Sequence, residues 1–215
     1  MKRLTSFVAA GLSAVSLTMA APAAHAAMHV SRAIAAAVAD PHRPAADRAR
    51  DAERKPAACV AFAAVHPGET IAELFPGTGY FTRICSRVVG PKGHVYEYQP
   101  KPRKPGAPAP VKAIAGDPHY YHNITVITWP VGKLPVPRPV DLVWTSPAGS
   151  GFSDTHTLHR IDPEAAKKEI MSAGFEFVGQ SDVLRNPEDS HTKIVFDPSI
   201  RGHTDQFIYK FRKPG

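Results

Sequence analysis

The segment with the clearest chemical pattern runs from Thr70 to Ile84. An acidic residue, Glu73, ends a short apolar run, and two glycines, Gly77 and Gly79, follow it with one residue between them. Because glycine has no Cβ, such a turn lets a ligand approach the backbone N–H groups, and the start of a helix supplies more of them. The pattern predicts a strand, a tight turn and a helix that together bind a nucleotide-like cofactor.

Two features limit which cofactor this turn can bind. Phe75 and Thr82 occupy places where the dinucleotide fingerprint G-x-G-x-x-G would have glycines, which disfavours a nicotinamide-binding protein. The acid that usually binds the ribose hydroxyls is replaced by Gln99, a neutral and weaker acceptor, although Glu97 lies on the same side of that strand. An ordinary Pro-Gly turn before a core helix remains an alternative explanation of the segment.

The pattern of apolar residues predicts the elements that would position this turn. Strands alternate with helices and end in an antiparallel pair, so we expect a Rossmann-like, three-layer α/β sandwich with a mostly parallel sheet. Two proline-rich loops, 100–110 and 130–139, interrupt the alternation. The expected helices cover residues 30–38, 47–55, 56–65, 80–89, 111–115 and 163–173, and the expected strands cover 70–75, 94–99, 124–128, 140–145, 175–184 and 206–212.

Residues 1–26 have the pattern of a secretory signal peptide. Lys2 and Arg3 precede an apolar run that ends in an A-x-A site, so we expect cleavage after Ala26 and a periplasmic or secreted protein. A retained membrane anchor is the alternative, although the run is rich in Ala, Ser and Thr. No later segment is expected to be long and apolar enough to span a bilayer. The rest of the chain, 27–215, has the size of one domain, in which 27–66 form an N-terminal helical extension.

The charge pattern bears on the partners of the protein. The formal net charge is +7, but acidic side chains alternate with the basic ones, as in residues 47–55. This favours a solvated helix over a phosphate-binding stripe, so no nucleic-acid partner is expected.

The cysteines and histidines offer little further chemistry. Cys59 and Cys85 could form one disulfide after export or remain buried thiols. No carboxylate stands at a diagnostic spacing from the histidines, so no metal site is expected. Two pairs are spaced three residues apart, His119 with His122 and His156 with His159.

The sequence Glu73 to Gly79 also has the form [Asp/Glu]-x-x-x-Gly-x-Gly. It resembles motif I of class I S-adenosylmethionine-dependent methyltransferases, with Phe75 in place of the first glycine. Over almost all of the mature chain, the sequence resembles a family of exported, predicted methyltransferases. The segments that carry this similarity are 39–44, 47–51, 54–56, 75–82, 141–146, 158–162, 173–175 and 201–207.

The resemblance implies a fold, a cofactor and a set of binding residues. The cofactor would be S-adenosylmethionine, and the methyl acceptor would be a small or otherwise unknown molecule. Cofactor binding is then expected from the acid and glycines of the turn, the first helical residue and the residue at the end of the second strand. These are Glu73, Gly77, Gly79, Tyr80 and, as the weaker candidate, Gln99.

The chain departs from the proteins it resembles after Ser146. In those proteins a helix and a fifth strand follow, whereas here Ser146 runs directly into the small-residue turn 147–151. One central strand and one helix are therefore expected to be missing, which leaves backbone groups unpaired unless strand four pairs with a C-terminal strand. Because the segment would form one wall of the acceptor pocket, a non-catalytic relative that only binds the cofactor is the alternative to an enzyme.

Overall fold

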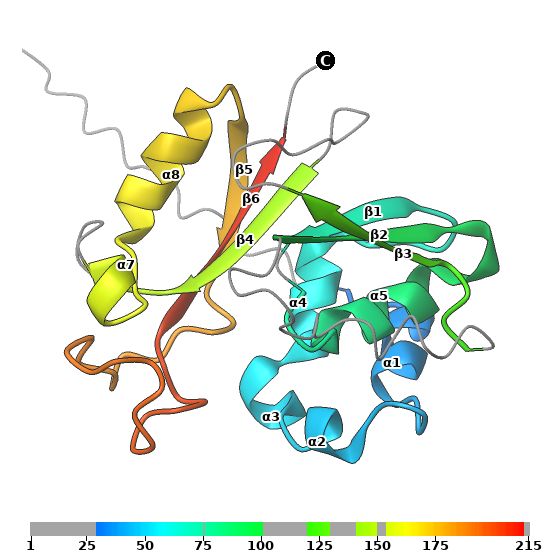
Figure 1. Cartoon of the computed structure of the whole chain (residues 1–215), viewed down its shortest axis with the longest axis horizontal. Coiled ribbons are helices and arrows are strands. Elements are labelled where there is room, and N and C mark those ends of the chain that lie inside the picture. The colour runs from blue at the N-terminus through cyan, green and yellow to red at the C-terminus, as the bar shows by residue number, and fades with distance from the viewer. Residues whose placement is uncertain (1–28, 75, 101–119, 130–140, 150–153, 213–215) are drawn as a thin grey trace, which may run out of the picture.

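The strands in the described part of the chain form two separate three-stranded sheets (Figure 1). In this computed structural model the described residues are 29–74, 76–100, 120–129, 141–149 and 154–212. The first sheet is parallel, in the order β1-β2-β3, and the second is antiparallel, in the order β4-β6-β5. The strands are β1 Thr70–Leu74, β2 His94–Pro100, β3 Ile124–Trp129, β4 Asp141–Pro147, β5 Glu176–Ser181 and β6 Gln206–Arg212.

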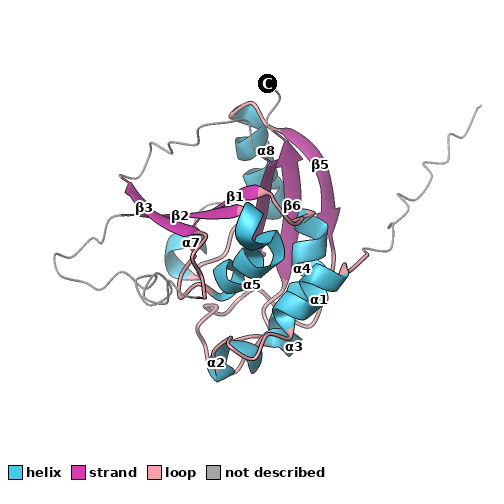
Figure 2. Ribbon diagram, turned by 90° about the vertical axis from the view of Figure 1, so that its right-hand side faces the viewer, coloured by secondary structure: helices cyan, strands magenta, loops and turns pink. Residues whose placement is uncertain are grey.

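Helices cover one side of each sheet. α1, α4 and α5 pack together beside the parallel sheet, and α8 lies against the antiparallel sheet (Figure 2). Ser31 caps α1 and Asp162 caps α8, where Pro163 takes the first helical position. The helices are α1 Arg32–Val38, α2 Ala45–Arg48, α3 Asp51–Arg54, α4 Pro56–Ala63, α5 Tyr80–Val89, the 3-10 helix η1 Gly90–Lys92, α7 Asp154–Thr157 and α8 Pro163–Ser172.

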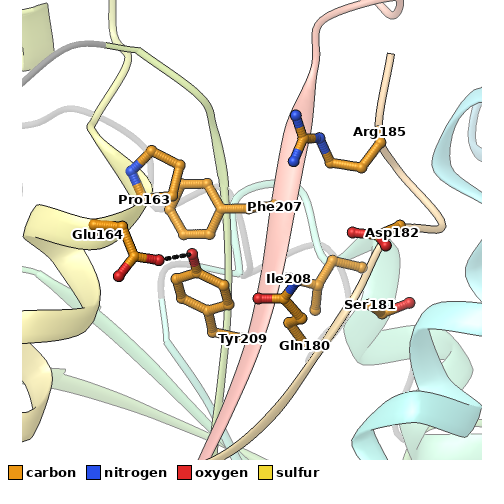
Figure 3. A pocket seen from close by; sticks show the side chains of 9 residues that line it. All are labelled: Pro163, Glu164, Gln180, Ser181, Asp182, Arg185, Phe207, Ile208 and Tyr209. Carbon is orange, nitrogen blue, oxygen red and sulfur yellow. Dashed lines mark hydrogen bonds between the residues drawn. The ribbon is translucent and has the colours of Figure 1, made fainter. Parts of the chain in front are cut away.

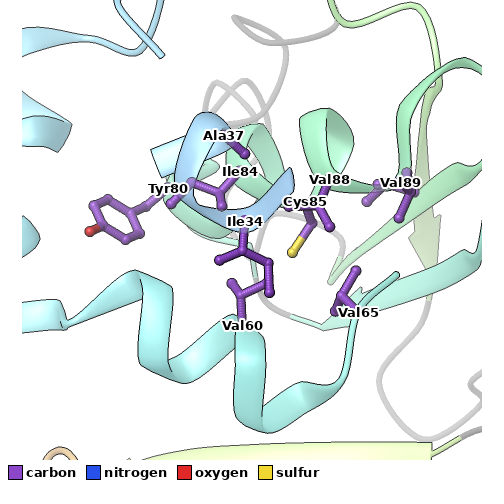
Figure 4. Close-up of a cluster of buried hydrophobic side chains, with 10 residues drawn as sticks. Ile34, Ala37, Val60, Val65, Tyr80, Ile84, Cys85, Val88 and Val89 are labelled. Carbon is purple, nitrogen blue, oxygen red and sulfur yellow. The ribbon is translucent and has the colours of Figure 1, made fainter. Parts of the chain in front are cut away.

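Each sheet has its own hydrophobic core. Ile84 and Val88 of α5 point with Val60 of α4 into the first core (Figure 4), because side chains four residues apart share one face of a helix. The second core contains Phe211 and Ile170, which join β6 to α8. Two lysine contacts join the halves of the molecule: Lys55 Nζ donates to the Val183 carbonyl over 2.7 Å, and Lys210 Nζ donates to the Ala63 carbonyl over 3.3 Å.

The expected fold class is confirmed. Where the sequence predicts a missing central strand, β4 pairs directly with a C-terminal strand. β4 pairs antiparallel with β6, from Asp141 opposite Arg212 to Pro147 opposite Gln206. The hydrogen bonds that a neighbouring parallel strand would make to β4 are thus replaced on one edge. The difference from expectation is that β4 lies outside the parallel sheet, and within the described part of the chain β1 pairs only with β2.

Other expectations differ in detail. The polar helix expected over 47–55 is two short helices, α2 and α3, and Lys55 then takes a left-handed conformation with φ +43°. β5 is shorter than expected and carries a bulge between Phe177 and Gly179. The signal peptide, the helix expected over 111–115 and almost all of the two proline-rich loops lie outside the described residues. Within the described ranges, no helix has the length and apolar character needed to cross a bilayer.

Candidate functional site

The glycine turn joins β1 to α5, as the sequence predicts. Gly77 and Gly79 both have left-handed backbone, with φ +59° and +78°, and Gly79 is the N-cap residue of α5. The Gly79 N–H donates to the Pro76 carbonyl over 2.9 Å, which closes the turn. A Cβ placed on Gly77 would meet no heavy atom within 4 Å, so the main chain of the turn is open at this exposed residue.

Glu73 is the penultimate residue of β1, and Thr82 of α5 joins it to the first turn of that helix. Glu73 is half-buried, and its carboxylate accepts a 2.5 Å hydrogen bond from the Thr82 hydroxyl. Burial raises the pKa of Glu73 to about 7; the hydrogen bond from Thr82 opposes this rise, and the charge of Glu97 adds to it. The carboxyl group of Glu73 therefore titrates near neutral pH.

Glu97 is the register partner of Glu73 on β2 and is fully buried. Neither of its carboxylate oxygens has a hydrogen-bond partner in the structure. Burial raises the pKa of Glu97, and the nearby Thr82 hydroxyl and, after it, the positive charge of Arg83 oppose that rise. Two negative charges on neighbouring, buried carboxyl groups would repel each other and would be poorly solvated. Glu73 and Glu97 therefore favour a state in which one of the two carboxyl groups keeps its proton.

The other two predicted cofactor residues differ in what they contact. The side chain of Tyr80 is almost fully buried, and its hydroxyl donates to Asp51 over 2.6 Å. The Arg54 guanidinium lies over the Tyr80 ring, 4.4 Å from its centroid. The side chain of Tyr80 thus joins the turn to the N-terminal extension.

Gln99 lies in β2 opposite Thr128, two residues beyond Glu97 towards the carboxyl end of the strand. The cofactor role of both Tyr80 and Gln99 stays a prediction.

Several residues at the turn were not identified from the sequence. Thr82 bonds to Glu73, and Arg83 bonds both to the turn carbonyls and to Asp47 of α2. Thr82 lies at the opening of the predicted helix, where its hydroxyl could have been considered as a partner of the acid. The contact between Asp47 and Arg83 joins residues 36 positions apart, and no local pattern predicts it.

The cysteines and histidines make no further site in the described part of the chain. Cys59 and Cys85 are free thiols, and burial raises the pKa of both, that of Cys59 to about 11. His122 and His159 are exposed, and the ring of His159 lies 4.9 Å from that of Phe196. No three His, Cys, Asp or Glu side chains among the described residues gather in a way that could hold a metal ion.

Two hollows lie away from the glycine turn. One, of about 380 Å³, lies between the alanine-rich face of α1 and the side chains of Arg87 and Tyr120. The other, of about 210 Å³, lies on the antiparallel sheet, where Tyr209 bonds to Glu164 and Arg185 faces the same space (Figure 3). Neither contains a residue of the turn, so neither is assigned to the cofactor.

Comparisons with known proteins bear on the fold. No protein-family model matches the sequence, and no curated protein matches it. Among solved structures, an S-adenosylmethionine-dependent methyltransferase from Aquifex aeolicus is similar, with a TM-score of 0.51 and 12% identity over 79% of this chain and 95% of that chain.

Two further solved structures have lower TM-scores. Aeropyrum pernix fibrillarin with natively bound S-adenosyl-L-methionine has a TM-score of 0.41 and 17% identity over 68% of this chain and 67% of that chain. An arsenic(III) S-adenosylmethionine methyltransferase from Chlamydomonas reinhardtii has a TM-score of 0.44 and 11% identity over 85% of this chain and 73% of that chain. The chain thus has a Rossmann-like α/β fold, shared with the Aquifex aeolicus methyltransferase.

Proposed function

We propose that this protein is an S-adenosylmethionine-dependent methyltransferase that acts on an acceptor still to be identified. The observation that carries the proposal is the junction of β1 and α5, where Glu73 is followed by a turn that is open at Gly77. In α/β folds, ligands bind at the carboxyl ends of parallel strands, and this junction lies at that end of the sheet. The fold shared with a methyltransferase supports the same conclusion.

The residues of the junction fit a cationic adenosyl cofactor. The open side of Gly77 leaves room for a ligand to approach the main chain. Glu97 has two buried oxygens without hydrogen-bond partners, and Glu73 adds a second carboxyl group beside it. A positively charged ligand would stabilise the ionised form of this pair. Glu73, Gly77 and Gly79 are proposed to hold the cofactor, with the backbone of Tyr80 and the amide of Gln99 as further contacts.

The demands of the reaction on the protein are modest. S-adenosylmethionine supplies an electrophilic methyl group on a sulfonium. The protein must hold the acceptor in line with that group and exclude water, and any base only removes a proton from the acceptor. We assign no base, because no described residue of the turn is placed by its contacts to act on an acceptor.

A non-catalytic protein that binds the cofactor is the second candidate. It is favoured by the direct pairing of β4 with β6, which leaves no strand between them. In the proteins that the sequence resembles, a strand and a helix at this point would form part of the acceptor pocket. A chain without them could keep the cofactor half of the fold and lose the transfer half.

Calorimetric titration of residues 27–215 separates these functions. The proposal expects binding of S-adenosylmethionine and S-adenosylhomocysteine, and no binding of NAD. Failure to bind either adenosyl ligand would overturn it, and binding of NAD alone would replace it with a nicotinamide-binding function. Transfer of a labelled methyl group to candidate small molecules then distinguishes an enzyme from a protein that only binds.

The protein is further proposed to act outside the cytoplasm. The support is the signal-peptide pattern of residues 1–26. Expression of the full chain in a bacterium with two membranes, followed by the intact mass of the product, tests this. A mature chain that starts at Ala27 in the periplasmic fraction is expected, and a product that keeps residues 1–26 in the cytoplasm would contradict it.

A further inference from the structure

The guanidinium of Arg83 lies against the carbonyl groups of the glycine turn. Its Nη1 atom donates to the Thr78 carbonyl over 3.0 Å and to the Gly79 carbonyl over 3.2 Å. The same atom lies 2.7 Å from Oδ2 of Asp47, which belongs to α2 in the N-terminal extension. The side chains of Arg83 and Asp47 are only 11% and 10% exposed, so water screens their pairing weakly.

The position of Arg83 is electrostatically unfavourable on its own. Arg83 lies in the first turn of α5, and the N-terminal end of a helix carries partial positive charge, so a cation there is destabilising. The carboxylate of Asp47 offsets this charge and holds the guanidinium beside the turn. Loss of that carboxylate is expected to release the Arg83 side chain towards solvent and to free the carbonyl of Thr78, whereas the Gly79 carbonyl keeps its bond from the Arg83 backbone N–H.

We infer that Asp47 is a positioning residue for the cofactor site: through Arg83 it fixes the conformation of the glycine turn and neutralises a positive charge beside it. This inference rests on the proposed function for the identity of the ligand. It gives residues 27–66 a role in cofactor binding, because the N-terminal extension supplies the carboxylate that the turn requires. It also explains why an ion pair joins α2 to the helix that follows the turn.

The inference makes different predictions for the two adenosyl ligands. S-adenosylmethionine carries a positive sulfonium, whereas S-adenosylhomocysteine carries a neutral thioether. In Asp47→Asn the guanidinium of Arg83 loses the carboxylate that is ion-paired with it, so the sulfonium ligand is repelled more than the thioether. In Arg83→Gln the contacts with the turn are lost together with the charge, so both ligands are expected to weaken without a preference against the sulfonium.

The chain offers a matched control one helical turn further along α5. Arg87 lies 3.3 Å from Asp40 of the same N-terminal extension, and Asp40 is also buried. None of the hydrogen bonds of Asp40 reaches the glycine turn. Asp40→Asn therefore removes an equivalent buried carboxylate charge and should lower the melting temperature without a change in affinity for either ligand.

The decisive experiment combines titration with hydrogen exchange on residues 27–215. For Asp47→Asn we expect the Kd of S-adenosylmethionine to rise about tenfold and that of S-adenosylhomocysteine about threefold, a size typical of charges at helix ends. Exchange of the amides of 77–81 in ligand-free protein should quicken in Asp47→Asn and Arg83→Gln but not in Asp40→Asn.

Two results would separate failure of this inference from failure of the proposed function. If Asp47→Asn lowers the melting temperature but leaves both the ratio of the two Kd values and the exchange of 77–81 unchanged, Asp47 is only structural and the inference is wrong. If the unaltered protein binds neither ligand, the proposed function is wrong, and the exchange measurement alone then decides whether Asp47 orders the turn.

Discussion

Glu73 and Glu97 are register partners on the adjacent parallel strands β1 and β2, and Glu97 is buried without a hydrogen-bond partner for either oxygen. Two carboxyl groups on one face of a sheet repel each other when both are ionised. The two carboxyl groups stay on adjacent strands although, among the described residues, the hydrogen bond to this pair comes from Thr82 alone, which donates to Glu73. This arrangement lowers the free energy of unfolding at neutral pH. Carboxyl groups with strongly raised pKa values are common at the functional sites of proteins.

The pH dependence of stability follows from the raised pKa values of this pair. The pKa of Glu73 lies at about 7 in the folded protein, above the ordinary 4.5 of a glutamate, and burial raises the pKa of Glu97 as well. Between these pH values the native state binds more protons than the unfolded state, so the free energy of unfolding falls as pH rises through this window. Urea unfolding of ligand-free protein from pH 4.5 to 8 measures the expected fall.

Replacement of Glu97 isolates its share of this effect. Glu97→Gln removes a buried acid that has no partner, so the free energy of unfolding should rise by about 1–3 kcal/mol at pH 8 and by much less at pH 4.5. Glu188, which is exposed, provides the control, and Glu188→Gln should have no effect at either pH. An equal change at both pH values in Glu97→Gln would show that packing, and not charge, is responsible.

A buried ion pair in the C-terminal half leads to a second stability prediction. Arg160 is fully buried and bonds to both carboxylate oxygens of Asp189, over 2.8 Å and 3.1 Å. The hydrogen bonds from Arg160 and from the backbone of Asp205 outweigh burial and lower the pKa of Asp189. Asp189→Asn leaves the guanidinium without its counter-charge, and the free energy of unfolding should fall by about 3–5 kcal/mol in a urea titration.

The contacts of Arg160 also fix the long connection between β5 and β6. Its Nε atom donates to the carbonyl of Lys193, so Asp189→Asn should make residues 185–205 more sensitive to limited proteolysis. Glu169→Gln, on the exposed face of α8, is the control and should change neither unfolding nor cleavage. A loss of less than about 1 kcal/mol in Asp189→Asn would mean that water reaches the pair and screens it.

Most helices and strands were predictable because each depends on a pattern of residues within its own segment. Apolar spacing predicts α5, the Asp162-Pro163 sequence predicts the start of α8, and the glycines predict the turn. The pairing of β4 with β6 was anticipated only as one of two outcomes. Sequence spacing does not specify which edge of which sheet a strand joins, since that choice depends on all the strands together.

The contacts of the candidate site were less predictable than its backbone. Tyr80 was expected to bind the cofactor, and the sequence did not indicate that its hydroxyl bonds to Asp51, which lies in a segment interpreted from the sequence as a solvated helix. The alternation of acids and bases over 47–55 has the same appearance whether the acids face water or a partner. Asp47 and Asp51 instead turn towards α5, where Arg83 and the Tyr80 hydroxyl supply partners that lie far along the chain.

The cysteines give a prediction about covalent state. Cys59 and Cys85 are free in the structure, and burial raises the pKa of both thiols, so little thiolate is present at pH 8. Alkylation by iodoacetamide should be slow in folded protein and should reach both residues after denaturation without a reductant. A mass that rises by two hydrogen atoms on reduction would show instead that the two residues form a disulfide after export.

The openness of the glycine turn can be tested with one methyl group. Gly77→Ala adds a Cβ that meets no atom of the protein but places alanine at φ +59°, at a cost of about 1–2 kcal/mol. Gly68, with φ +84° and equally open surroundings, is exposed and precedes β1, away from the turn, so Gly68→Ala should have a similar cost. If the ligand approaches the main chain at the turn, only Gly77→Ala should also weaken binding of S-adenosylhomocysteine in calorimetry. Equal affinities in the two variants would place the cofactor elsewhere, because the added methyl group at Gly77 would then occupy only solvent.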